Sequence, residues 1–132
     1  MSAVVADASA ILAVLLDEPG ADTVVRRIHG GAVICAVNWA EVVTRLVDVG
    51  ADASTVRADI AQSAGWGVLQ VIAFDQHLAE VAAELRLATR DRGLSLGDRA
   101  CLALARHLGL PAVTADRDWA DIDVGVPVVL IR

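Results

Sequence analysis

The sequence predicts an α/β fold in which a mostly parallel sheet is covered by helices on both faces. Short runs of β-branched and small apolar residues alternate along the chain with longer segments of helical periodicity. The short runs are apolar throughout, as expected for strands that are buried on both faces. A length of 132 residues fits one domain, and we expect residues 1–132 to form it.

The elements follow from these patterns in chain order. The β-branched runs predict strands at 3–6, 32–36, 68–74, 112–115 and 126–131. Helices are predicted between them at 8–17, 21–29, 38–49, 53–64, 76–92 and 97–108. Apolar residues in the last two helices recur at i, i+3, i+4 and i+7. Glycines follow most helical segments, as expected at helix ends: Gly20, Gly30, Gly50, Gly93 and Gly109.

The charged residues exclude several classes of protein. All 11 basic residues are arginine, so chemistry that needs a lysine is excluded, including the P-loop of NTPases and Schiff-base enzymes. The same absence argues against a receiver domain and against a phosphatase of the haloacid-dehalogenase type. The net charge of −6 argues against broad nucleic-acid binding through a basic face. It is compatible with metal binding or with a basic protein partner.

Compartment signals predict a cytoplasmic protein. Cys35 and Cys101 form no CxxC motif, and we expect both to be buried, reduced thiols. The longest apolar run, at 10–16, is too short to cross a bilayer. Asp7 interrupts the position at which the apolar part of a signal peptide would begin.

Four carboxylates lie just after a predicted strand or in the first turn of the next helix: Asp7, Glu41, Asp98 and Asp116. In an open parallel sheet these positions meet at one edge, where ligands bind. Carboxylates gathered there would repel one another unless divalent cations neutralised them. The pattern therefore favours a metal site.

Asp7 and Glu41 also allow structural explanations. Asp7 could cap the helix that follows it. Glu41 could pair with Arg45 or form a capping box with Asn38. On a helical wheel Glu41 lies opposite a predicted apolar stripe, so periodicity alone favours a solvated side chain; the stripe is Trp39, Val43 and Leu46.

The other acidic residues also allow both a structural and a functional explanation. Asp98 has capping-box spacing with Ser95, but its predicted side of the helix is the inward one, shared with Cys101, Leu102 and Ala105. Asp116 could cap a short turn. Asp118, Asp121 and Asp123 form a mildly acidic patch that we expect at the surface.

Four segments together resemble the PIN-domain family, and within it the VapC toxin group of bacterial type II toxin–antitoxin modules. They are "VVADASAIL", "AVNWAEVV", "LSLGDRACLALA" and "VTADRDWADI". The resemblance implies a three-layer α/β/α sandwich with a five-stranded parallel sheet. It also implies an endoribonuclease that depends on Mg²⁺ or Mn²⁺, forms a homodimer and is inhibited by a cognate VapB-type antitoxin.

By the same resemblance, the catalytic and metal-binding set is Asp7, Glu41, Asp98 and Asp116. Ser9 and Thr114 match polar positions that support the cluster, and Asp118 matches a more variable acidic position. Oxygen ligands suit Mg²⁺ or Mn²⁺. The histidines do not form a convincing zinc cluster and are expected at the surface or at helix ends: His29, His77 and His107.

The residues that could contact an antitoxin or RNA form less specific patterns than the acidic set does. An arginine of the antitoxin could enter the carboxylate cluster in place of metal. Apolar residues of the first two helices could form its groove or belong only to the core: Leu12, Leu15, Leu16, Val24 and Val25. Four arginines could guide RNA or be ordinary surface charge: Arg90, Arg92, Arg99 and Arg117. The alternative function is a non-catalytic, acidic, metal-stabilised module that binds RNA or protein.

Overall fold

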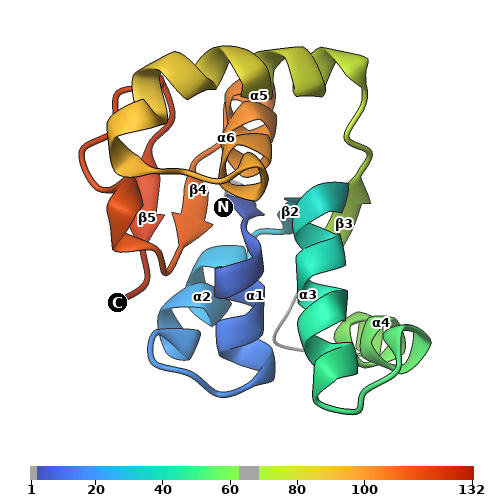
Figure 1. Cartoon of the computed structure of the whole chain (residues 1–132). Helices are drawn as coiled ribbons and strands as arrows, with labels where there is room; N and C mark the ends of the chain where they lie inside the picture. Colours follow the sequence, from blue (N-terminus) through green and yellow to red (C-terminus); the bar gives the residue numbers. More distant parts are fainter. Residues whose placement is uncertain (1–2, 63–68) are drawn as a thin grey trace.

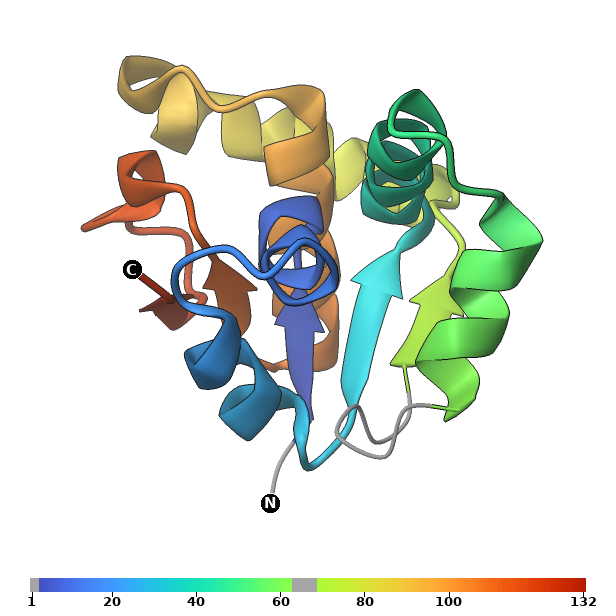
Figure 2. The same ribbon diagram turned by 90° about the horizontal axis from the view of Figure 1, so that it is seen from below.

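The sheet has five strands and is parallel throughout. The computed structural model describes residues 3–62 and 69–132. The strand order is β3-β2-β1-β4-β5, and all four pairings are parallel. Figure 2 shows β1 between β2 and β4. The strands are β1 (Val4–Ala6), β2 (Ala32–Cys35), β3 (Leu69–Ile72), β4 (Ala112–Thr114) and β5 (Val128–Leu130). The predicted α/β class is confirmed.

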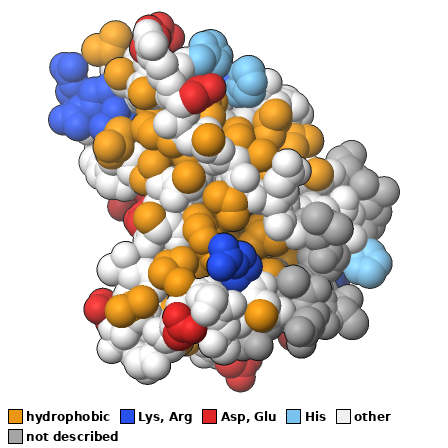
Figure 3. Space-filling model, turned by 90° about the vertical axis from the view of Figure 1, so that its right-hand side faces the viewer, with side chains coloured by type: hydrophobic (Ala, Val, Ile, Leu, Met, Phe, Trp, Pro, Cys, Tyr) orange, Lys and Arg blue, Asp and Glu red, His pale blue; other side chains and the backbone are white. Residues whose placement is uncertain are grey.

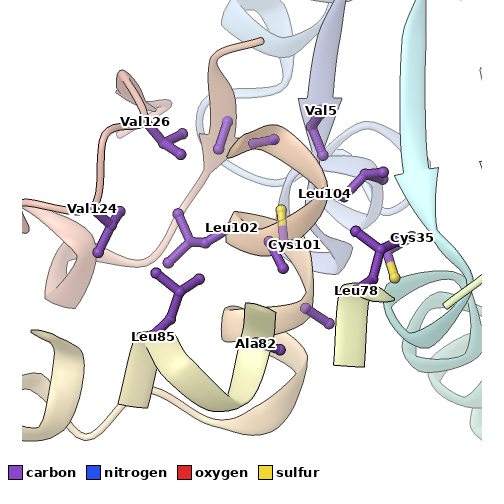
Figure 4. Close-up of a cluster of buried hydrophobic side chains, with 14 of the residues drawn as sticks. Val5, Cys35, Leu78, Ala82, Leu85, Cys101, Leu102, Leu104, Val124 and Val126 are labelled. Carbon is purple, nitrogen blue, oxygen red and sulfur yellow. The ribbon is translucent and has the colours of Figure 1, made fainter. Parts of the chain in front are cut away.

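Helices cover both faces of this sheet, as the predicted three-layer sandwich requires (Figure 1). Alternate strand residues face opposite layers: Val4 and Ala6 pack into one core cluster, and Val5 packs into the other. The first layer contains α1 (Ala8–Leu15), α2 (Ala21–Ile28), α3 (Ala36–Asp48) and α4 (Ala53–Gln62). The second contains α5 (Gln76–Thr89) and α6 (Leu96–Leu108), and Figure 4 shows its side chains.

Several predicted boundaries differ from the structure by a few residues. Strand β5 is shorter than predicted, but pairing continues at both ends: Ala112 N donates to Pro127 O, and Ile131 N donates to Thr114 O. The predicted helix 76–92 ends at Thr89, and residues 90–92 form a separate 3₁₀ turn, η1 (Arg90–Arg92). The predicted residues 63, 64 and 68 lie outside the described residues.

The predicted apolar stripe of α3 is wrong in part. The buried residues are Asn38, Val42 and Leu46, whereas Trp39 and Val43 are half-buried. Asn38 takes an inward position because its amide finds hydrogen-bond partners there. A search for apolar spacing passes over such a residue.

Other surface and core expectations hold. Cys35 and Cys101 are free and buried, and all three histidines are exposed. None of the helices in the described ranges could span a membrane. Strand β3 is a sheet edge, and Val71 on it is 44% exposed. Figure 3 shows apolar side chains gathered on one face around an arginine, with acidic side chains towards the rim.

Candidate active site at the carboxyl ends of the strands

Asp7 follows β1 directly and is 5% exposed. It caps α1, because Ala10 N donates to its Oδ1 at 2.9 Å. Ser9 Oγ donates to the same oxygen at 2.7 Å, and Thr114 Oγ1 donates to Oδ2 at 2.5 Å. The capping role considered from the sequence is therefore present. It uses part of one oxygen and leaves acceptor capacity on the other.

Burial dominates the electrostatics of this carboxyl group. It raises the pKa of Asp7 to about 6, although the bonds from Thr114, Ser9 and Ala10 oppose the rise. The nearby negative charge of Asp98 raises the pKa further. At neutral pH Asp7 is mostly charged in a place that disfavours charge, which is the electrostatic setting that a bound cation would relieve.

A hydroxyl network joins β4 to this carboxylate. Thr114 Oγ1 accepts from Asp116 N at 3.0 Å, and Ser9 Oγ accepts from Ala115 N at 2.9 Å. Asp116 is half-buried and caps the 3₁₀ turn η2 (Arg117–Trp119), since Asp118 N donates to its Oδ1 at 2.9 Å. Asp118 itself is exposed. The backbone of Asp116 is thereby tied to the group that binds Asp7.

Asp98 lies in the first turn of α6 and is half-buried. It forms a complete capping box: Ser95 N donates to Asp98 Oδ2 at 2.9 Å, and Asp98 N donates to Ser95 Oγ at 3.1 Å. The face it was predicted to share is fully buried, with Cys101, Leu102 and Ala105 at 0% exposure. Asp98 therefore lies at the rim of that face rather than inside it.

Glu41 is exposed, as its position on the wheel predicted. Its carboxylate is nevertheless held, because Asn38 Nδ2 donates to Oε1 at 3.0 Å. The buried thiol of Cys101 is close enough to three carboxylates to respond to their charges. Its pKa is raised well above the ordinary value by burial first, and also by the negative charges of Asp7, Asp98 and Glu41.

The donor set suits a hard divalent cation, because it consists of carboxylate and hydroxyl oxygens. Within residues 3–62 and 69–132, no three His, Cys, Asp or Glu side chains stand close enough together to hold an ion in their present rotamers. The described side chains therefore fit a divalent metal in the chemistry of their oxygen donors, although their present positions do not by themselves form a three-ligand site.

The four candidate arginines do not share one environment. Arg99 is half-buried, and its Nη1 donates to Ala82 O of α5 at 2.9 Å. Arg99 therefore has a structural role, which is to tie α6 to α5, and its predicted role in guiding RNA stays a prediction. Arg90, Arg92 and Arg117 are exposed and remain available for a polyanion.

An open cleft of about 420 Å³ is lined in part by Glu41. Its lining combines apolar and charged residues: Ala8, Ser9, Leu12, Leu16, Glu18, Glu41 and Arg45. Of the residues considered for an antitoxin groove, Leu12 and Leu16 line the cleft, whereas Val24 belongs wholly to the core. The predicted groove lay on the first two helices, whereas part of the lining of this cleft comes from Glu41 and Arg45 of α3.

Comparison with known proteins identifies the class. The family model for the PIN domain matches residues 4–125, so the chain belongs to the PIN-domain family. A search of curated proteins finds no match.

Solved structures give the same fold. A toxin–antitoxin complex from Klebsiella pneumoniae is 21% identical and covers 98% of each chain, with a TM-score of 0.75. VapC20 of Mycobacterium tuberculosis, described as a toxin that cleaves the sarcin–ricin loop, is 22% identical over 96% of this chain and 99% of its own, with a TM-score of 0.71. VapBC-5 of M. tuberculosis is 25% identical over 100% of this chain and 99% of its own, with a TM-score of 0.59.

Proposed function

We propose that the chain is a toxin of the VapC type, an endoribonuclease that uses Mg²⁺ or Mn²⁺ to cleave RNA phosphodiester bonds. The observation that carries the proposal is the buried carboxylate of Asp7, whose pKa is raised to about 6 by burial and also by the nearby negative charge of Asp98. Such a cluster costs stability without a cation. PIN-domain nucleases generally use divalent metals, and the likeness to VapC20 supports RNA as the substrate.

In this proposal Asp7, Asp98 and Asp116 are the preferred metal ligands, and Glu41 binds the metal directly or through water. A divalent ion held there would acidify a water molecule and stabilise the charge that develops on the scissile phosphate. Ser9 and Thr114 orient Asp7 through the hydrogen bonds described above. Asp118, which is exposed beside Asp116, has a supporting role.

We further propose that a VapB-type antitoxin inhibits the protein. Related structures are described as toxin–antitoxin or VapBC complexes. An antitoxin arginine could form charge-assisted hydrogen bonds with the carboxylates, and its apolar side chains could contact Leu12 and Leu16 in the cleft described above. Co-purification with the product of the neighbouring small gene tests this, and a toxin chain that stays separate from that product would contradict it. The homodimer stays a prediction, which sedimentation of the purified chain can measure.

The direct test of the enzyme is incubation of the pure protein with total RNA in Mn²⁺ or in EDTA. Discrete fragments that form only with Mn²⁺ support the ribonuclease. RNA that is bound in a gel-shift assay but never cut, with either Mg²⁺ or Mn²⁺, would instead favour the non-catalytic binding module.

A further inference from the structure

Asn38 occupies the first turn of α3 and is 1% exposed. Its Nδ2 donates two hydrogen bonds, to Glu41 Oε1 at 3.0 Å and to the carbonyl oxygen of Gly97 at 2.9 Å. The first acceptor lies on its own helix and the second on α6. One amide nitrogen therefore links the two helix starts that carry Glu41 and Asp98.

Gly97 provides the space for this arrangement. It lies in the first turn of α6 and is buried. A Cβ atom added to it would lie 2.5 Å from Glu41 Oε1 and 3.1 Å from the carboxyl carbon of the same side chain. The backbone there is helical, so the position does not need glycine for its conformation. The glycine lets the Glu41 carboxylate lie against the first turn of α6, which also carries Asp98.

Burial of the Asn38 side chain has an unfavourable contribution to the free energy of folding. Its Oδ1 is buried and has no hydrogen-bond partner among the described residues. Buried polar atoms without partners are uncommon, and they concentrate at functional sites. An aspartate in the same shape would have no donor for Glu41 and would repel it, because both groups would be negative. A neutral side chain with two N–H groups on one nitrogen is what the two acceptors require.

We propose that Asn38 and Gly97 are positioning residues that together hold the Glu41 carboxylate against the first turn of α6, which carries Asp98. The proposal rests on the proposed ribonuclease function and extends it. Glu41 is exposed and would otherwise sample several rotamers in solvent. The hydrogen bond from Asn38 holds the Glu41 carboxylate near α6, and the absence of a side chain at Gly97 leaves space for that carboxylate.

The main test is Gly97→Ala, because it removes no polar group. Alanine is a better helix former than glycine, and the atom it meets is the end of a flexible side chain, so the variant should melt at or above the wild-type temperature. We expect its kcat for metal-dependent RNA cleavage to fall by about 10- to 100-fold, with KM nearly unchanged. Adding Gly97→Ala to Glu41→Gln should cause no further loss. Leu96→Ala, in the same turn but 53% exposed, is the matched control and should keep wild-type kcat.

A second measurement needs neither metal nor RNA. The side-chain NH₂ signals of Asn38 in a ¹H–¹⁵N NMR spectrum report the bond to Glu41 in the apo protein. They should shift in Gly97→Ala and in Glu41→Gln and stay in place in Leu96→Ala. If the wild type cleaves no RNA, the proposed function fails. The spectrum would still test whether Asn38 and Gly97 hold the Glu41 carboxylate in place. A Gly97→Ala variant with unmoved Asn38 signals would overturn the inference, as would one with wild-type kcat.

Asn38→Asp provides an independent variant of the same shape. It removes both donors and places a negative charge beside Glu41. We expect a loss of kcat similar to that of Gly97→Ala in folded protein, with circular dichroism as the check on folding. Wild-type kcat in a folded Asn38→Asp protein would also overturn the proposal.

Discussion

Thr114 donates its hydroxyl hydrogen bond to Asp7 Oδ2 over 2.5 Å, although 107 positions separate the two residues. The bond joins the ends of two neighbouring parallel strands, β4 and β1. It favours the charged form of a carboxyl group whose burial disfavours charge. Thr114, itself 0% exposed, therefore makes the site's most buried carboxylate less costly to ionise.

Replacing Thr114 by valine should separate this hydrogen bond from packing, because the two side chains have similar shape. The change leaves Asp7 Oδ2 without its donor. We expect the free energy of unfolding at pH 7.5 to fall by about 1–3 kcal/mol. Thr114→Ser keeps the hydroxyl and should lose much less. Urea denaturation measures both, and equal losses in the two variants would show that the hydroxyl does not matter.

The pH dependence of stability follows from the raised pKa of Asp7. The folded value is about 6 and the ordinary value is 3.8, so between these pH values the folded protein binds more protons than the unfolded one. Stability from this group is fully present below pH 3.8 and is lost as pH rises through about 6. The loss at neutral pH is of the order of 3 kcal/mol.

Asp7→Asn should remove this part of the pH dependence while keeping the cap, because the asparagine oxygen can still accept from Ala10 N and Ser9 Oγ. We expect the variant to be at least as stable as the wild type at pH 7.5. Denaturation across pH 4 to 7.5 measures the slopes. A variant with the wild-type slope would mean that Asp7 is not the titrating group.

Arg99 and Arg117 should behave differently, although both adjoin acidic residues in the sequence. Arg99→Ala removes the bond to Ala82 O and should lower the melting temperature. Arg117→Ala changes an exposed side chain beside Asp116, so it should leave stability nearly unchanged and weaken RNA binding most at low salt. Thermal melts and RNA binding at two salt concentrations separate the effects. If Arg99→Ala instead weakened RNA binding and left the melting temperature unchanged, Arg99 would be assigned to the RNA-binding surface.

The sequence was sufficient for the sheet, because apolar runs and strand-to-helix junctions are local signals, and the metal site formed by the four acidic residues stays a prediction. It could not show the role of Asn38, since the partner carbonyl is 59 positions away on Gly97. The structural bond of Arg99 could not be predicted for the same reason, because its acceptor, Ala82 O, belongs to another helix. The hydrogen bond of Thr114 to Asp7 follows from the parallel pairing of β1 with β4, whereas that of Ser9 is local, two residues along the chain. The resemblance indicated these two positions without their geometry.

The central claim is that Asp7 serves metal-dependent RNA cleavage rather than folding. The most direct measurement compares wild type, Asp7→Asn and Asp75→Asn with total RNA in Mn²⁺ and in EDTA. Asp75 is the matched control, since it caps α5 through Leu78 N at 2.9 Å in the same way that Asp7 caps α1, but it is exposed. We predict Mn²⁺-dependent fragments from wild type and Asp75→Asn, and none from a folded Asp7→Asn protein. Undiminished cleavage by purified Asp7→Asn would contradict the account.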